Sequence, residues 1–271
     1  AAEVRDCRKL HILPGVIDSQ VHFREPGPVH KEDLETGSRA AVAGGVTLVF
    51  EMPNTKPTTT GPEALADKVS RARNRMFCDF AFYVGGTREN VEAIPALEKL
   101  EASAGIKVFA GSSTGDLLVD DDEGLEAIIS RLTRRAAFHS EDEFRLRDRV
   151  GFQVAGDAAS HPVWRDVEAA VLCTTRLLRI ARKHGKRIHV LHISTAEELP
   201  LLAAHRDVAT VEVTPHHLTL SADDYARLGA KLQMNPPIRD KRHRDALWAA
   251  INNGLVDVLG SDHAPHTLEE K

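Results

Sequence analysis

Short apolar, often β-branched runs alternate with amphipathic helical stretches along nearly the whole chain, and this alternation constrains the fold more than any other feature. Eight runs have the length and composition of buried strands, at residues 10–18, 47–52, 79–84, 105–110, 135–139, 187–192, 208–213 and 256–259. Helical periodicity fills most of the intervals, at residues 31–43, 62–73, 88–102, 122–134 and 163–183, with further stretches near Ala222 and Lys241. Such a pattern is typical of parallel strands joined by crossover helices. Eight units close a barrel, so the sequence predicts an α/β fold of the (β/α)8, TIM-barrel type.

An open, doubly wound sheet is the alternative fold for an alternating pattern. It is less favoured, because no glycine-rich phosphate loop follows the first run. Two helices have starts that suit a capping box, with Thr60 and Glu63 at one and Thr195 and Glu198 at the other. Residues 145–162 show no regular period, and we expect an irregular segment there. No helical stretch follows the eighth run, so we expect the chain to be part of a longer protein.

Charge and cysteine content exclude several functional classes. The formal net charge is -5, and no run of lysine or arginine gives electrostatic support for binding nucleic acid. The 3 cysteines lie far apart and form no CxxC pair, which favours a reducing compartment such as the cytoplasm. The longest apolar runs are much shorter than the ~20 residues that a membrane-spanning helix requires. We therefore expect neither nucleic acid nor a membrane as a partner.

Polar residues that could bind a metal stand where predicted strands end. They are His22, Lys107, His139, His192 and Asp262. In a barrel the carboxyl ends of all strands open on one face, so these residues would converge there. Imidazole and carboxylate suit zinc or manganese. A single histidine at a strand end is more often a packed residue, but four imidazole or carboxylate groups in equivalent places predict a metal site.

Lys107 is the least obvious member of this set. Its neighbours Ile106 and Val108 are apolar, and the spacing by itself favours a buried or snorkelling lysine. An ammonium group cannot bind a metal. The lysine could do so only after losing its proton, or after reacting with carbon dioxide to form an anionic carbamate.

Four further polar residues follow strands and could contact a substrate. Arg24 could hold a carboxylate through two hydrogen bonds, or could simply pair with Glu25 at the surface. Asn54 and Asn235 could each donate to and accept from an imide or urea-like ring, although asparagine is also common in turns. His266 lies on the last loop, beyond Asp262.

Seven segments together resemble the dihydroorotases, which are cyclic amidohydrolases. They are residues 13–18 (LPGVID), 21–27 (VHFREPG), 30–33 (HKED), 44–47 (GGVT), 52–55 (MPNT), 235–237 (NPP) and 261–266 (SDHAPH). The resemblance covers nearly the whole chain, and its first and last motifs are the most diagnostic. It implies a barrel at residues 11–271, with residues 1–10 as the remnant of a small β-rich domain.

The resemblance also implies a site and a reaction. A carboxylated Lys107 would bridge two zinc ions, with His139 and His192 on one ion and His22 and Asp262 on the other. Asp262 would carry a proton from the attacking water to the leaving nitrogen. The substrate, held by Arg24, Asn54, Asn235 and His266, would be a small molecule with a carboxylate. The reaction would interconvert N-carbamoyl-L-aspartate and L-dihydroorotate in pyrimidine biosynthesis. We expect a homo-oligomer, with a transcarbamoylase as a further candidate partner.

Gln20 departs from the family, which has histidine at this position. An amide oxygen is a much poorer zinc ligand than imidazole. We therefore expect one firm metal and a second that is weakened or absent, with activity reduced or lost. Two alternatives stay open: a non-catalytic dihydroorotase-like partner of a transcarbamoylase, and another cyclic amidohydrolase such as an allantoinase.

Overall fold

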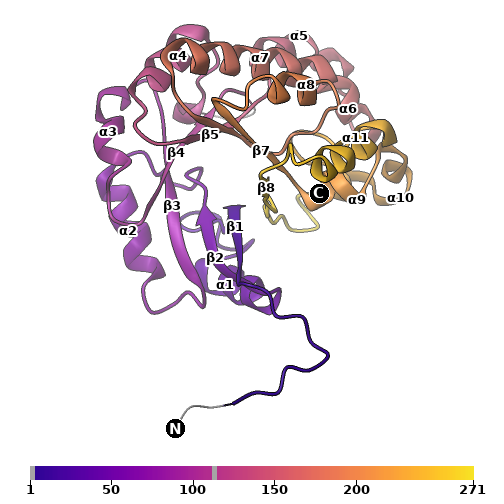
Figure 1. Cartoon of the computed structure of the whole chain (residues 1–271). Coiled ribbons are helices and arrows are strands. Elements are labelled where there is room, and N and C mark those ends of the chain that lie inside the picture. Colours follow the sequence, from indigo (N-terminus) through magenta and orange to yellow (C-terminus); the bar gives the residue numbers. More distant parts are fainter. Residues whose placement is uncertain (1–3, 112–114) are drawn as a thin grey trace.

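A computed structural model describes residues 4–111 and 115–271. Its eight strands are hydrogen-bonded in chain order and all neighbouring pairs are parallel (Figure 1). They are β1 (Val16–Val21), β2 (Val46–Glu51), β3 (Asp79–Gly85), β4 (Ser103–Phe109), β5 (Ala136–His139), β6 (Ile188–Val190), β7 (Ala209–Val213) and β8 (Val258–Leu259). A bridge between Val21 and His263 links the chain after β8 back to β1. The predicted (β/α)8 barrel is thereby confirmed.

The helices lie around the outside of the strands (Figure 1). Those between successive strands are α1 (Leu34–Ala43), α2 (Pro62–Ala72), α3 (Ile94–Leu97), α4 (Asp122–Arg131), α7 (Val167–His184), α8 (Glu198–Ala203) and α11 (Lys241–Asn252). Shorter pieces stand before α7 and after β7, namely α5 (Glu143–Asp148), α6 (His161–Trp164), α9 (Pro215–Thr219) and α10 (Tyr225–Leu228). None of the helices in the described ranges combines the length and the apolar character that a bilayer-crossing helix requires.

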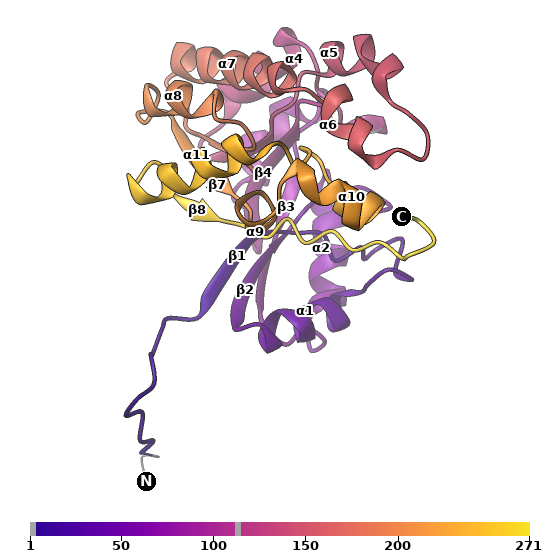
Figure 2. The ribbon, with the colours of Figure 1, turned by 90° about the vertical axis from the view of Figure 1, so that its right-hand side faces the viewer.

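The first strand begins later than the sequence predicts. The apolar run starts at residue 10, but β1 starts at Val16, where its pairing with Val46 of β2 begins. Residues 4–15 contain no strand and run away from the barrel in two perpendicular views (Figure 1, Figure 2). Leu10 and Leu13 are exposed there. A strand needs a hydrogen-bonding neighbour, and the run before Val16 pairs with no strand of the described residues, so its composition alone is misleading.

Two helix starts differ from the expected capping boxes. Gly61 caps α2 with no side-chain hydrogen bond, since the helix begins at Pro62 and Thr60 lies one residue too early to cap it. Before α8 one bond of the expected box exists, since Thr195 Oγ1 accepts from the Glu198 nitrogen at 3.1 Å, but the hydroxyl then donates to the Glu198 carboxylate at 2.8 Å. They close the turn before the helix, which begins at Glu198 itself.

Two predicted helices are also shorter than expected. In the 88–102 interval only a 3-10 turn and α3 form, and the chain then reverses through Ala102, whose φ of 63° cannot continue a right-handed helix. The helix expected from residue 163 is divided into α6 and α7. Asp166 separates them, and its carboxylate accepts a hydrogen bond from the Ala169 nitrogen at 3.1 Å.

The wall between strands and helices is apolar and tightly packed. Phe82, Ile106 and Phe138 from the strands have no exposed surface, and neither do Ile128 of α4 and Leu177 of α7. Burial of this kind stabilises the fold by ~25 cal/mol for each Å² of apolar surface removed from water. It also holds the strands rigidly, which fixes the positions of the side chains at their carboxyl ends.

One ion pair interrupts this apolar wall. Lys68 of α2 is 0% exposed and Glu51 of β2 is 1% exposed, and the lysine ammonium contacts the Glu51 carboxylate and donates to the Met52 carbonyl at 2.9 Å. Burial acts against both charges, raising the pKa of Glu51 and lowering that of Lys68. Each charge is therefore tolerated because the other is present.

We expect Lys68→Met to destabilise the protein by about 3–5 kcal/mol, because it leaves the Glu51 carboxylate buried without a cation. The double variant Lys68→Met/Glu51→Leu should recover most of this loss, since apolar side chains of similar volume need no counter-charge. Urea unfolding of the two variants and the parent measures the difference. Equal destabilisation in the single and double variants would show that the loss of unfolding free energy comes from altered packing and not from the unpaired charge.

Candidate metal and substrate site

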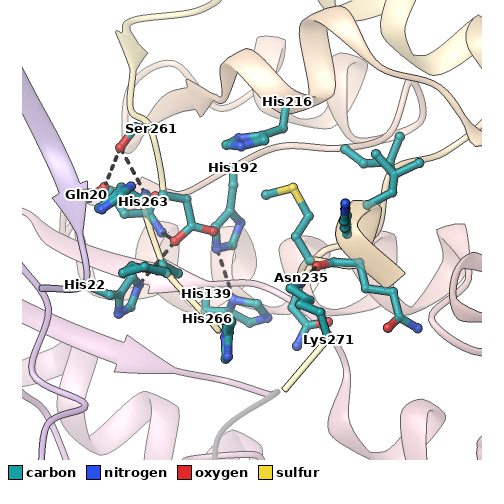
Figure 3. A pocket seen from close by; sticks show the side chains of 18 of the residues that line it. Gln20, His22, His139, His192, His216, Asn235, Ser261, His263, His266 and Lys271 are labelled. Carbon is teal, nitrogen blue, oxygen red and sulfur yellow. Dashed lines mark hydrogen bonds and ion pairs between the residues drawn. The ribbon is translucent and has the colours of Figure 1, made fainter. Parts of the chain in front are cut away.

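A cavity of about 650 Å³ lies at the carboxyl ends of the strands (Figure 3). Every residue that the sequence analysis singled out for the site lines it, namely Gln20, His22, Arg24, Asn54, Lys107, His139, His192, Asn235, Asp262 and His266. They come from both ends of the chain and from the middle. The barrel brings them together as predicted, and the structure shows how they are paired.

His139 and His192 form the first pair. The Nδ1 atom of His139 lies 3.0 Å from Nε2 of His192, and both rings are buried (Figure 3). Burial lowers the pKa of both imidazoles, so they are neutral near pH 7. The other nitrogen of His139 lies 2.8 Å from Glu141, an acceptor that fixes the proton on Nε2 and leaves a lone pair on Nδ1. This neutral, oriented form is the one that binds metals.

Glu141 is itself held from the other side. Arg165, fully buried next to α6, forms an ion pair with its carboxylate. Although burial opposes the charge, the Arg165 guanidinium and the His139 ring hold the pKa of Glu141 well below its usual range. A permanent carboxylate therefore stands behind His139.

Gln20, His22 and Asp262 form a second cluster. Gln20 Nε2 donates to Asp262 Oδ1 at 2.9 Å, and Nε2 of His22 lies 3.2 Å from the same oxygen. Burial works against the Asp262 charge, but the bond to His22 and the nearby imidazoles lower the pKa of this carboxyl to about 2. Gln20 Oε1 is buried and has no hydrogen-bond partner among the described residues. Gln20 thus contacts the cluster through its nitrogen, which cannot bind a metal.

Lys107 lies close to both groups. Its side chain is buried, with Nζ 3.5 Å from the Val108 carbonyl and 4.1 Å from the centre of the Phe109 ring. No carboxylate of the described residues is within ion-pair distance of it. Burial lowers the pKa of Lys107 to about 7, so in a fraction of the molecules this side chain is an uncharged amine at neutral pH. An uncharged amine is the form that can react with carbon dioxide.

The donor chemistry fits a metal only in part. Nowhere in residues 4–111 and 115–271 do three His, Cys, Asp or Glu side chains converge closely enough to hold an ion. His139 and His192 supply two imidazoles, and His22 and Asp262 supply an imidazole and a carboxylate. A third ligand would have to come from Lys107, which fits this role as a carbamate and does not fit it as an ammonium.

Arg24 and Asn54 lie at the edge of the second cluster. Arg24 donates from Nε to the Pro265 carbonyl at 3.1 Å, and one of its terminal nitrogens lies 3.2 Å from Nε2 of His266. Asn54 Oδ1 lies 2.7 Å from Nδ1 of His22, so the amide oxygen holds the imidazole and the amide nitrogen is left over.

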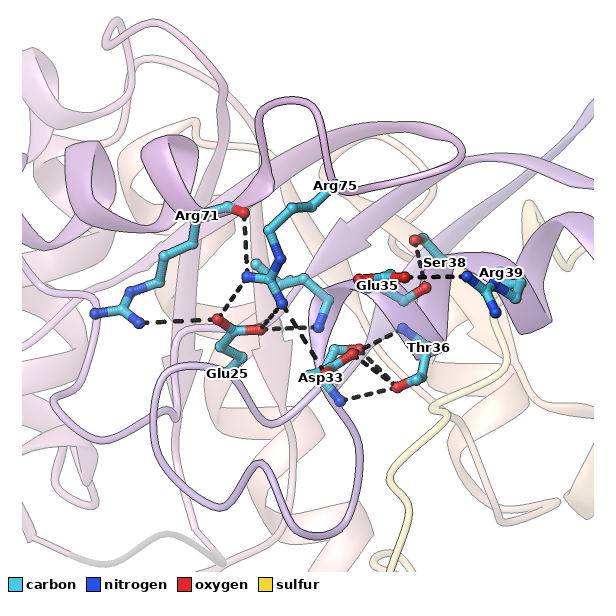
Figure 4. Close-up of polar contacts among 9 residues, drawn as sticks. Glu25, Asp33, Glu35, Thr36, Ser38, Arg39, Arg71 and Arg75 are labelled. Atoms are coloured by element: carbon cyan, nitrogen blue, oxygen red, sulfur yellow. Dashed lines mark hydrogen bonds and ion pairs between the residues drawn. The ribbon is translucent and has the colours of Figure 1, made fainter.

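The surface pairing of Arg24 with Glu25, considered from the sequence, does not form. Glu25 is buried and faces the other way, where Arg75 donates to its carboxylate at 2.8 Å and Arg71 lies 3.8 Å away (Figure 4). Its second oxygen accepts from the Leu34 nitrogen at the start of α1. The side chains of Arg24 and Glu25 thus point to opposite sides of the chain, and that of Arg24 lines the cavity.

The backbone is strained at three positions of the site. Arg24, His192 and Asp262 have φ values of 64°, 38° and 51°, in the left-handed region that side chains disfavour. Each such residue costs about 1–3 kcal/mol and persists only where the surrounding structure enforces it. Their concentration around one cavity is typical of a functional site.

Several cavity residues were not foreseen from the sequence, including His161, His216, Lys231 and Gln233. The most firmly placed is His161, whose Nε2 lies 3.0 Å from Asn235 Oδ1. It stands in the interval that was expected to be irregular, and in the structure that interval contains only short helical pieces. No local pattern could identify it, because its contacts come from more than 70 residues away along the chain.

Comparison with known proteins agrees with this geometry. The sequence model of the amidohydrolase family matches residues 11–269. The chain belongs to the amidohydrolase family.

Relatives of this amidohydrolase include enzymes with different names. It is 37% identical to a dihydroorotase of Methanosarcina mazei over 281 residues, covering 99% of this chain and 61% of the relative. It is 39% identical to a dihydroorotase of Halobacterium salinarum over 267 residues, covering 96% and 61% of the two chains. An allantoinase of Streptomyces avermitilis is 33% identical over 283 residues, covering 100% and 62%. The chain thus spans about three-fifths of the length of these relatives.

Among solved structures, the amidohydrolase resembles the L-hydantoinase (dihydropyrimidinase) from Arthrobacter aurescens. The TM-score is 0.89 at 28% sequence identity, covering 95% of this chain and 59% of the other. The dihydropyrimidinase of Brevibacillus agri gives a TM-score of 0.85 at 27% identity. The barrel is therefore shared with a hydantoinase and a dihydropyrimidinase.

Proposed function

We propose that this protein is a dihydroorotase, which interconverts N-carbamoyl-L-aspartate and L-dihydroorotate in pyrimidine biosynthesis. The observation that carries the proposal is Arg24 at the cavity wall. It is half-buried, and no carboxylate in the described ranges lies within ion-pair distance of it. An arginine at a polar cavity, with no carboxylate of the described residues in direct contact with it, suits a substrate carboxylate. Dihydroorotate has such a group, whereas the rings opened by allantoinases and hydantoinases lack it.

The ligand pairs support a proposed metal centre. We assign His139 and His192 to one zinc ion, His22 and Asp262 to a weaker second site, and a carboxylated Lys107 to the position between them. When bound, zinc lowers the pKa of a water molecule and polarises a carbonyl group. Gln20 is the reason for the weaker second site, since its amide nitrogen faces Asp262 where the family has an imidazole.

The chain's own residues would then orient the substrate and move the proton. Asp262, with a pKa of about 2, is ionised at neutral pH and can accept a proton from the attacking water. As the ring C–N bond breaks, the same carboxyl returns that proton to the leaving nitrogen. Asn54, Asn235 and His266 line the cavity around this position and can bind the ring amides and the carboxylate.

The assembly of the protein and its compartment are also proposals. We expect a homo-oligomer, for which a transcarbamoylase is a further candidate partner. The described cysteines, Cys7, Cys78 and Cys173, are all unpaired, which supports a reducing compartment such as the cytoplasm.

Activity measurements on the full-length protein test the proposal, with dihydroorotate, allantoin and hydantoin compared at equal concentrations. Dihydroorotate should be the preferred substrate. Arg24→Gln should raise the KM for dihydroorotate by about tenfold, which corresponds to the ~1.4 kcal/mol of one charge-assisted hydrogen bond. It should leave any slow hydrolysis of hydantoin unchanged.

Arg206→Gln is the matched control. Arg206 forms an ion pair with Asp257, with a nitrogen–oxygen distance of 2.6 Å, and does not line the cavity. Turnover of allantoin in preference to dihydroorotate would favour the allantoinase alternative. If a correctly folded, zinc-supplied protein bound and turned over none of the three, the interpretation as a non-catalytic partner of a transcarbamoylase would replace the proposal.

A further inference from the structure

His161 contacts the substrate side of the cavity in a way that the proposed mechanism does not use. It begins α6, and the residue is 8% exposed. The Nε2 atom lies 3.0 Å from the Met234 carbonyl oxygen and 3.0 Å from Asn235 Oδ1. A backbone carbonyl can only accept a hydrogen bond, so Nε2 must carry the proton. The same N–H therefore also faces the side-chain oxygen of Asn235.

This contact decides which way the Asn235 amide points. With its oxygen directed at the His161 N–H, its nitrogen is left for the cavity that Asn235 lines (Figure 3). The reversed amide would bring two donors together at about the same distance. The other tautomer of His161 would bring its bare nitrogen against two acceptors. Both alternatives lose a hydrogen bond at a buried ring, which costs about 1–3 kcal/mol.

The ring of His161 is held in place by the helix that carries it. Trp164 packs edge-on against it, with ring centres 5.8 Å apart, and donates from its indole to the Leu146 carbonyl at 2.8 Å. Next along the chain, Arg165 pairs with Glu141, and its carbonyl accepts from Arg239 at 2.9 Å. Burial lowers the pKa of His161, which agrees with a neutral ring that acts as a fixed donor.

We propose that His161 is a positioning residue that fixes the Asn235 amide so that its nitrogen donates into the cavity. The cavity wall at Asn235 then selects an oxygen acceptor on the substrate, such as a ring carbonyl or a carboxylate, and disfavours a ring N–H. The substrate part of this inference rests on the proposed function, whereas the orientation of the two side chains does not.

The test uses the full-length protein, the three single variants His161→Leu, His161→Gln and Asn235→Ala, and one double variant. His161→Leu removes the donor at similar volume and should lower kcat/KM for dihydroorotate about tenfold, mainly through KM, which is the effect of one lost hydrogen bond. His161→Gln places an amide nitrogen near the position of Nε2 and should recover activity to within about threefold of the parent. In an Asn235→Ala background, His161→Leu should change kcat/KM by less than about twofold.

Two controls separate positioning from folding. His205→Leu removes a comparable ring contact, 2.7 Å to the Leu201 carbonyl, outside the cavity, and should leave kcat/KM unchanged. The 15N chemical shifts of the His161 ring in the ligand-free protein should report a proton on Nε2. A proton on Nδ1 alone, or an equal loss from His161→Leu with and without Asn235, would overturn the proposal. If dihydroorotate is not a substrate, the 15N result still decides the orientation, so the two failures are distinguishable.

Discussion

Replacing Lys107 with methionine should lower dihydroorotate turnover by about 10³-fold and reduce the zinc content of the purified protein. Methionine has a similar volume and can pack against the Phe109 ring, so the barrel should fold as before. It cannot react with carbon dioxide, and the two ligand pairs would then have no group to complete them. Loss of metal-assisted polarisation removes several kcal/mol of transition-state stabilisation.

Zinc per chain, measured by mass spectrometry, and turnover are the two readouts for this variant. Lys186→Met is the matched control, because Lys186 is a half-buried lysine that donates to the Leu132 carbonyl at 2.8 Å, away from the cavity. The parent protein grown with 13C-bicarbonate should also show a carbamate signal that the Lys107 variant lacks. Full zinc content in Lys107→Met would remove this lysine from the proposed metal centre.

Gln20→His should have the opposite effect. We expect the variant to bind a second zinc ion and to turn over dihydroorotate about 100-fold faster than the parent, since replacing even an indirect partner of a metal ligand typically changes affinity by about 10–100-fold. The parent amide donates to Asp262, and its buried oxygen has no hydrogen-bond partner in residues 4–111 and 115–271. An imidazole would remove that unpaired oxygen and release the carboxylate for the metal.

Gln153→His is the control for this gain, because Gln153 lines the same cavity without contacting either ligand pair in the described structure. It should leave zinc content and turnover as they are. A parent as active as Gln20→His would show that one intact pair is enough. If both proteins fold but are inactive, the non-catalytic partner becomes the better interpretation.

The convergence of the site could be predicted from the sequence because it depends only on where strands end. His139 and His192 lie 53 positions apart, and Gln20 and Asp262 lie 242 apart, yet each stands at the carboxyl end of a strand or within a few residues after it. In a parallel barrel that position alone determines that the residues share a face. Alternation of apolar and polar segments was sufficient to predict the fold.

The pairing within the site could not be predicted in this way. Whether Arg24 faces the cavity or Glu25 depends on backbone torsions, and its φ of 64° turns the chain between the two residues. Glu141, which accepts from His139, and His161, which donates to Asn235, both come from the interval after β5, where the sequence has no regular period. Contacts of this kind follow from tertiary packing, which leaves no trace in local periodicity.

The barrel closes where β1 meets the chain after β8, and the second ligand cluster lies at this seam, so it can contribute to the stability of the closed barrel. Backbone contact across the seam includes the bridge at Val21 and His263, with a hydrogen bond of 2.7 Å from the His22 nitrogen. Gln20 and Asp262 face each other across it. Any ion bound jointly by His22 and Asp262 would cross-link the two ends of the barrel, which are more than 200 residues apart in the sequence. Its binding free energy would add to the resistance of the barrel to opening, so that occupancy of the site and integrity of the fold would rise and fall together.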